Sequence, residues 1–222
     1  MPRIARVIAT NYPHHVTQRG NNRVDVFFDN EDKAFYLKTL RNYSQKYKVD
    51  IWVYCLMPNH LHLLAVPKDS ESLARCLGRT NLIYTQHVNR KYKRSGRLWQ
   101  NRFFSTLVEK DPYLWVVARY IENNPVKSRL TKKPEDYKWS SCRANMSGQG
   151  DELVRSHGWL EAKDRRGYKT FLGKQDPGIE ERIRRATSTG RPLGSERFIK
   201  KLERKLFRQF MLKKAGRPKK QK

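Results

Sequence analysis

A long apolar run, broken once near its middle, constrains the fold more than any other stretch. Ile51 to Val66 is rich in β-branched and aromatic residues, and Pro58-Asn59 is a turn signal that divides it into two strands. Because side chains alternate along a strand, His60 and His62 share one face of the second strand. Two imidazoles in this arrangement can bind one divalent metal if a third ligand comes from elsewhere. A pair of packed or surface imidazoles is the alternative.

Apolar periodicity elsewhere predicts two more strands and three helices. The predicted strands span residues 12–19, 49–57, 60–66 and 103–109. The predicted helices span 30–47, 111–123 and a segment that starts at Ser70 or Ser72 and ends near Tyr92. The order β-α-β-β-α-β with an added helix is the split βαβ, ferredoxin-like arrangement of an α+β protein. Its first and third strands lie at the centre of an antiparallel sheet. The strand with the two histidines is therefore expected to be a rigid support for a site.

The chain divides into three parts by composition. Residues 1–145 contain the predicted sheet, 146–194 form an extension and linker, and 195–222 form a basic helix and tail. The segment from Gly173 to Gly194 has several prolines and glycines and is interpreted as a linker. Ser195 is the predicted N-cap of the final helix.

The charge of the chain points to a polyanionic partner. Lys and Arg number 48 against 21 Asp and Glu, a net charge of +27, which favours nucleic acid. An anionic membrane surface is a less favoured partner, because no apolar run approaches the ~20 residues of a membrane span. No secretory signal opens the chain. The three cysteines are scattered, which favours buried reduced thiols in a cytoplasmic protein over a structural zinc site.

Two residues of the helix predicted after Pro112 carry further chemistry. Tyr120 and Asn124 are four apart, so they point the same way on a helix. The side-chain carbonyl of Asn124 is a hard oxygen ligand suited to Mg²⁺ or Mn²⁺. The phenol of Tyr120 can attack phosphorus and leave a covalent phosphotyrosine. A half-buried core tyrosine is the alternative.

Four separate motifs resemble one family. They are Tyr12 to Asn21, His60-Leu61-His62, Gly96 to Phe103 and Arg119 to Val126. In this order they are similar to the REP-associated tyrosine transposases, which are single-tyrosine members of the HUH single-strand endonuclease superfamily. The resemblance covers residues 1–145 and extends more loosely to the basic tail.

The resemblance implies a metal-dependent enzyme. His60, His62 and Asn124 would hold one Mg²⁺ or Mn²⁺, and Tyr120 would cleave and rejoin single-stranded DNA through a 5′-phosphotyrosine. The implied substrates are hairpin-forming palindromic repeats, the implied protein is a monomer or homodimer, and no membrane is involved. Asn124 departs from the glutamine expected in related transposases, and the residues indicate no general base. A non-catalytic basic nucleic-acid-binding protein with a ferredoxin-like fold is the alternative.

Seven side chains are predicted to contact DNA: Arg19, Arg23, Arg97, Trp99, Arg102, Arg191 and Arg217. The first two flank the turn at 20–22, which either cradles phosphate through backbone N–H groups or is a plain turn. Trp99 either stacks on an unpaired base or anchors the core. The last two arginines lie in Gly-Arg-Pro triplets, which either enter a minor groove or make nonspecific phosphate contacts.

Overall fold

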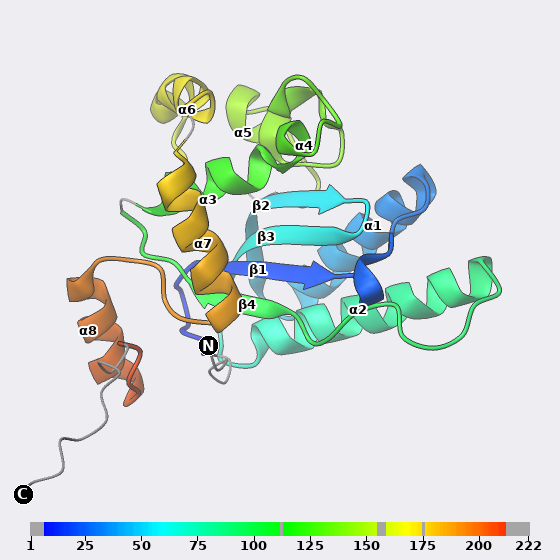
Figure 1. The fold of residues 1–222 in the computed structure, drawn as a ribbon, viewed down its shortest axis with the longest axis horizontal. Helices are drawn as coiled ribbons and strands as arrows, with labels where there is room; N and C mark the ends of the chain where they lie inside the picture. The colour runs from blue at the N-terminus through cyan, green and yellow to red at the C-terminus, as the bar shows by residue number, and fades with distance from the viewer. Residues whose placement is uncertain (1–6, 112, 155–158, 175, 212–222) are drawn as a thin grey trace, which may run out of the picture.

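A four-stranded antiparallel sheet lies at the centre of the computed structural model, which describes residues 7–111, 113–154, 159–174 and 176–211 (Figure 1). The strand order is β2-β3-β1-β4. The strands are β1 (His14–Arg19), β2 (Val49–Met57), β3 (His60–Pro67) and β4 (Phe104–Leu107). The predicted ferredoxin-like sheet is thus confirmed, with β1 and β3 at its centre.

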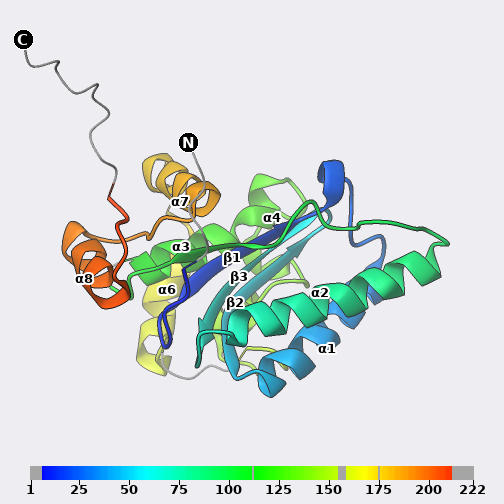
Figure 2. The same cartoon turned by 90° about the horizontal axis from the view of Figure 1, so that it is seen from below.

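Helices cover both faces of the sheet. They are α1 (Asn30–Lys46), α2 (Ser72–Lys91), α3 (Tyr113–Glu122), α4 (Asn124–Lys127), α5 (Cys142–Ser147), α6 (Arg165–Leu172), α7 (Pro177–Thr189) and α8 (Glu196–Leu206), with single 3₁₀ turns at Asn21–Arg23, Pro134–Asp136 and Ala162–Asp164. Helices α1 and α2 lie on one face, and α3 and α7 lie on the other (Figure 2).

The alternation along β3 sorts its side chains between the two layers. Leu61 and Leu63 are fully buried in the α1–α2 layer, and Leu64 packs in the α3–α7 layer. The same alternation turns His62 toward α3, where its ring contacts Tyr120. The sheet therefore holds the two histidines on the face that α3 and α7 cover.

Local capping chemistry sets the helix boundaries. Asp29 caps helix α1, because its side chain accepts a hydrogen bond of 2.8 Å from the backbone N–H of Asp32. Pro125 lies in the first turn of the short helix α4, where a backbone N–H has no partner within the helix and its absence is tolerated. The chain can therefore form a new helical turn directly after α3. The three cysteines are buried and unpaired, as predicted.

The segment predicted to be a linker is largely a helix, and this corrects the interpretation of residues 173–194. Asp176 caps α7 by accepting from the backbone N–H of Ile179 at 3.0 Å, and Pro177 occupies the first helical position. Gly190 ends the helix with a φ of 73°, a left-handed conformation that favours glycine. The proline and the glycine therefore mark the two ends of a helix whose Ile183 is fully buried.

The final helix packs against the start of the chain. Ser195 caps α8 as predicted, by accepting from the N–H of Phe198 at 3.2 Å. Phe198 and Leu202 pack with Val7, Ala9 and Leu107. Residues 131–150 include the 3₁₀ turn Pro134–Asp136 and α5. In the described part of the chain, no helix combines the length and apolarity needed to cross a bilayer.

Candidate active site

One cavity gathers the candidate residues between the sheet and the α3–α7 layer. It has a volume of about 330 Å³ and is lined from strands β1 and β3, the segment that leads into β4, and helices α3 and α7. Its lining residues are His15, Thr17, Gln18, Arg19, His60, His62, Gln100, Phe104, Tyr120, Arg184, Thr187 and Ser188. The strand-borne histidines and the helix-borne tyrosine thus meet in one space.

The two histidines of β3 present their rings nearly at right angles. The ring centroids of His60 and His62 are 5.0 Å apart, with an interplanar angle of 83°. The Nδ1 atom of His60 lies 2.6 Å from Oδ1 of Asn59, whose amide nitrogen donates to the carbonyl of Arg23. Because that amide oxygen can only accept, Nδ1 of His60 carries the proton and Nε2 has a free lone pair.

His62 is held by a second histidine from the neighbouring strand. Nδ1 of His62 lies 3.0 Å from Nε2 of His15, and the two rings are inclined by only 10°. Nδ1 of His15 lies 3.0 Å from the hydroxyl oxygen of Thr187 in α7. This chain of contacts joins the sheet to the C-terminal extension.

Burial keeps these imidazoles neutral. It lowers the pKa of His15 to about 3 and that of His60 to about 4, with Arg19 adding to the effect on His60. Burial, assisted by the neighbouring His60, His15 and Arg19, also holds the pKa of His62 well below its ordinary value. A neutral imidazole is the form that binds a metal, so the donor set suits a divalent ion.

Tyr120 points its ring edge-on at both buried histidines. Its centroid is 5.7 Å from that of His62 and 5.8 Å from that of His15. Burial raises the pKa of the phenol, while the nearby Arg184 and Arg19 act in the opposite direction. The ammonium of Lys127 lies 5.2 Å from the centre of the ring, which adds a third cation beside the phenol.

Asn124 lies one helical turn beyond Tyr120. Its amide nitrogen donates to the backbone carbonyl of Tyr120 at 2.7 Å and to that of Ile121 at 3.2 Å. These bonds use the nitrogen and leave the side-chain oxygen as the atom with ligand chemistry. The side chain is not among those that line the cavity. Within the described residues, no cluster of three or more histidine, cysteine or carboxylate groups is placed to hold an ion.

A second cavity of about 600 Å³ adjoins the first through Gln18, which lines both. Arg97 and Arg102 are exposed at its wall, where predicted DNA contacts would be accessible. Trp99 is 9% exposed and packs in a cluster with Phe27 and other aromatic rings. Its placement fits a core anchor, but Trp99 also lines this cavity, so base stacking stays a prediction.

Most backbone N–H groups at the turn of residues 20–22 already have partners within the protein. The N–H groups of Gly20, Asn21 and Arg23 donate to the carbonyls of Asn59, Leu98 and Gly20. A plain turn is the better description, although Arg19 and Arg23 keep exposed side chains. Arg191 is partly buried, and its guanidinium donates to the carbonyl of Phe210. Arg217 lies outside the described residues.

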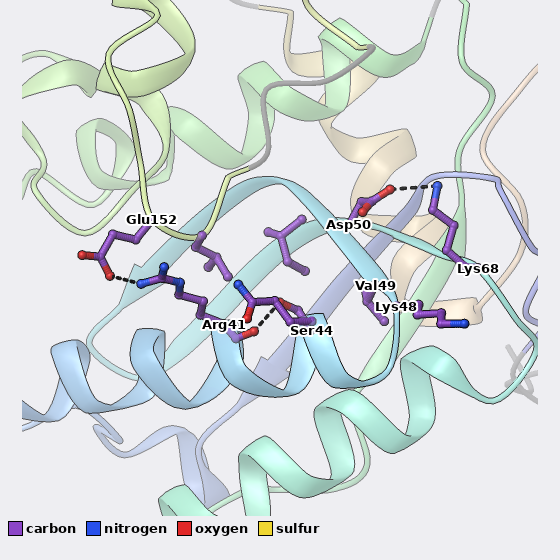
Figure 3. A pocket seen from close by; sticks show the side chains of 10 residues that line it. Arg41, Ser44, Lys48, Val49, Asp50, Lys68 and Glu152 are labelled. Carbon is purple, nitrogen blue, oxygen red and sulfur yellow. Dashed lines mark hydrogen bonds and ion pairs between the residues drawn. The ribbon is translucent and has the colours of Figure 1, made fainter.

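Another cavity, of about 400 Å³, lies beside α1 and the β2 edge (Figure 3). Two of the three cations that line it are ion-paired: Arg41 contacts Glu152 at 2.7 Å, and Lys68 contacts Asp50 at 2.8 Å. Lys48 lines the same cavity.

Sequence patterns did not single out His15, Arg184 and Thr187, which are among the residues that line the cavity. His15 lies in the first strand, where alternation with Thr17 places it on the site face. That alternation could have identified it. Arg184 and Thr187 lie in the segment interpreted as a linker, and Thr187 meets His15 across 172 positions of sequence. No local pattern predicts such a contact.

Comparison with known proteins identifies the family and the fold. Residues 8–124 match the family model described as IS200-like transposase. A REP-associated tyrosine transposase from Haemophilus influenzae is 23% identical over 158 residues, which is 63% of this chain and 89% of that protein. A solved REP-associated tyrosine transposase bound to a REP hairpin superposes with a TM-score of 0.57 at 17% identity, covering 72% of this chain and 98% of the other. Because the matched segment exceeds half of the chain, the protein belongs to the IS200-like transposase family.

Proposed function

We propose that this transposase cleaves and rejoins single-stranded DNA through a 5′-phosphotyrosine formed by Tyr120. The observation that supports it best is the placement of the Tyr120 ring 5.7 Å from that of His62, in one cavity with His60. Family membership makes DNA transposition the activity to explain.

The donor set fits a divalent cation. His60, with a free Nε2 lone pair, His62 and the side-chain oxygen of Asn124 would hold Mg²⁺ or Mn²⁺. When bound, the ion supplies positive charge that offsets the charge developing on the scissile phosphate. Asn124 reaches this role if its oxygen turns into the cavity when DNA binds.

The chain's own residues supply the nucleophile and the positive surroundings. The phenol oxygen of Tyr120 forms a bond to phosphorus as the bond from phosphorus to the 3′-oxygen breaks. The phenol loses its proton, and the leaving 3′-oxygen gains one. Arg184 and Arg19 favour the phenolate form. Rejoining reverses these steps with another 3′-hydroxyl and needs no added energy source, because the phosphodiester energy is kept in the intermediate.

The substrate follows from charge and from the related structure. The net charge of +27 favours a polyanion, and Arg97 and Arg102 are exposed beside the cavity that adjoins the site. The related solved protein is bound to a REP hairpin. We infer that the substrate is a hairpin-forming repeat with an unpaired strand that reaches Tyr120.

The test uses a labelled hairpin oligonucleotide with a single-stranded flank, incubated with Mg²⁺ or Mn²⁺. We expect a protein–DNA adduct that survives denaturation, disappears in Tyr120→Phe and persists in Tyr113→Phe. Tyr113 is a matched control because it lies in the same helix but outside the cavity, where its hydroxyl accepts from Arg182. Tight binding with no adduct from any hairpin that binds would instead indicate a non-catalytic binding protein.

A further inference from the structure

The hydroxyl of Thr187 sets the direction of a hydrogen-bond relay. It lies 2.8 Å from the carbonyl of Ile183, and a carbonyl can only accept, so the hydroxyl proton points there. The hydroxyl oxygen must then accept from Nδ1–H of His15, at 3.0 Å. This fixes the proton of His15 on Nδ1.

The relay continues to the metal-ligand candidate. A neutral His15 with its proton on Nδ1 has a bare Nε2, which accepts from Nδ1–H of His62 at 3.0 Å. His62 then has its free lone pair on Nε2. With the opposite polarity, His62 would carry its proton on Nε2 and could not bind an ion through that atom.

We propose that Thr187 is a positioning residue that acts through His15 to hold His62 in the tautomer competent to bind metal. Helix α7 therefore belongs to the active site rather than to a separate extension. The inference rests on the proposed function in one respect, which is that His62 is a metal ligand. Ligating histidines are commonly oriented by a hydrogen bond to their other ring nitrogen.

The contacts that fix α7 against the sheet support the positioning role of Thr187. Ile183 is fully buried and Thr187 is 8% exposed, so this face of the helix is fixed against the sheet. The hydroxyl of Thr106 in β4 donates to the carbonyl of Ala186 at 3.1 Å. At the other end of the helix, Glu180 pairs with Lys127 of α4. These contacts place the hydroxyl of Thr187 with little freedom.

The first test measures tautomers in the metal-free protein by ¹⁵N NMR of the imidazole nitrogens. We expect both His15 and His62 to carry their protons on Nδ1. A proton on Nε2 of His62 in the unmodified protein overturns the proposal by itself, with no variant needed. Because neither DNA nor metal is present, this result does not depend on whether Tyr120 forms an adduct.

The second test compares three variants. Thr187→Val removes the hydroxyl at nearly constant volume, and we expect Mn²⁺ binding, measured by electron paramagnetic resonance, to weaken tenfold to a hundredfold. Thr187→Ser keeps the hydroxyl and should restore both affinity and tautomers. Thr170→Val makes the same substitution in α6, outside the cavity, where the hydroxyl donates to the carbonyl of Arg166, and should change neither. Equal Mn²⁺ affinity and equal tautomers in Thr187→Val and Thr187→Ser would refute the relay.

Discussion

A buried neutral histidine outside the active site gives a quantitative prediction about pH. His14 is fully buried in β1, where its Nδ1 donates to the carbonyl of Tyr12 at 2.8 Å and its Nε2 accepts from the N–H of Ala9 at 3.2 Å. Both ring nitrogens are used by the neutral form, and a second proton would break the bond from Ala9. Burial lowers the pKa of His14 from 6.5 to about 4.

The sign follows from counting protons. As the pH falls below 6.5, the unfolded chain binds a proton at His14, while the folded chain stays neutral until about pH 4. The unfolded state therefore binds more protons in this window, so the free energy of unfolding decreases as the pH is lowered. The full stability is present above 6.5, and the loss is complete below 4. At about 1.4 kcal/mol per tenfold change in proton affinity, the total loss is about 3 kcal/mol, of which about 2 kcal/mol falls between pH 7 and pH 5.

The assay is urea unfolding at pH 7 and pH 5 in metal-free buffer, for the natural protein and for His14→Gln. The other buried histidines titrate in both proteins, so the difference between the two slopes isolates His14. We expect the variant to lose about 2 kcal/mol less than the natural protein over this interval, whatever its stability at pH 7. Equal slopes, or a ring that titrates near 6.5 by NMR, would refute the burial argument.

Three further predictions concern packing and charge. Glu122→Ala leaves three buried hydrogen-bond donors without their acceptor. Denaturant unfolding should show that the free energy of unfolding decreases by about 3 kcal/mol or more in this variant, and by less in Glu122→Gln. Gly20→Ala brings a methyl group against a backbone carbonyl and, at 2.7 Å, a valine methyl, so thermal unfolding should show a loss of about 1–3 kcal/mol. Replacing Arg97 and Arg102 with alanine should weaken hairpin binding and reduce the slope of log affinity against log salt by up to about 2, by fluorescence anisotropy, whereas Arg41→Ala, already ion-paired, should have little effect.

The central sheet could be predicted because its evidence is local. Alternation from Ile51 to Val66 places His60 and His62 on one face, and the structure pairs this strand with β1 in the centre of the sheet. The spacing of Tyr120 and Asn124 puts them on one side of consecutive helical turns. Each of these inferences needs only the period of one element and the element order.

The helix α7 could not be recognised from the same kind of evidence. Pro177, Gly178 and Gly190 suggested a linker, yet the proline begins the helix and Gly190 ends it. Only a short stretch between them carries buried apolar residues, and Ile183 is the only fully buried one. Because the apolar face is so narrow, the prolines and glycines favoured a linker over a helix. The Asp-Pro start and the glycine stop are nevertheless helix boundary signals.

Residues beyond the family-matched segment 8–124 influence the pKa of Tyr120, which lies within that segment. Burial raises the pKa of Tyr120, which opposes formation of the phenolate. Two arginines act against that rise: Arg19 belongs to β1, and Arg184 belongs to α7, beyond the matched residues 8–124. Glu180, also in α7, adds to the rise in the pKa of Tyr120. Its carboxylate approaches Arg184 at 3.6 Å and pairs with Lys127 beside the same phenol. The proposed nucleophile lies within the family-matched segment, but part of the charge that would favour its phenolate comes from outside that segment.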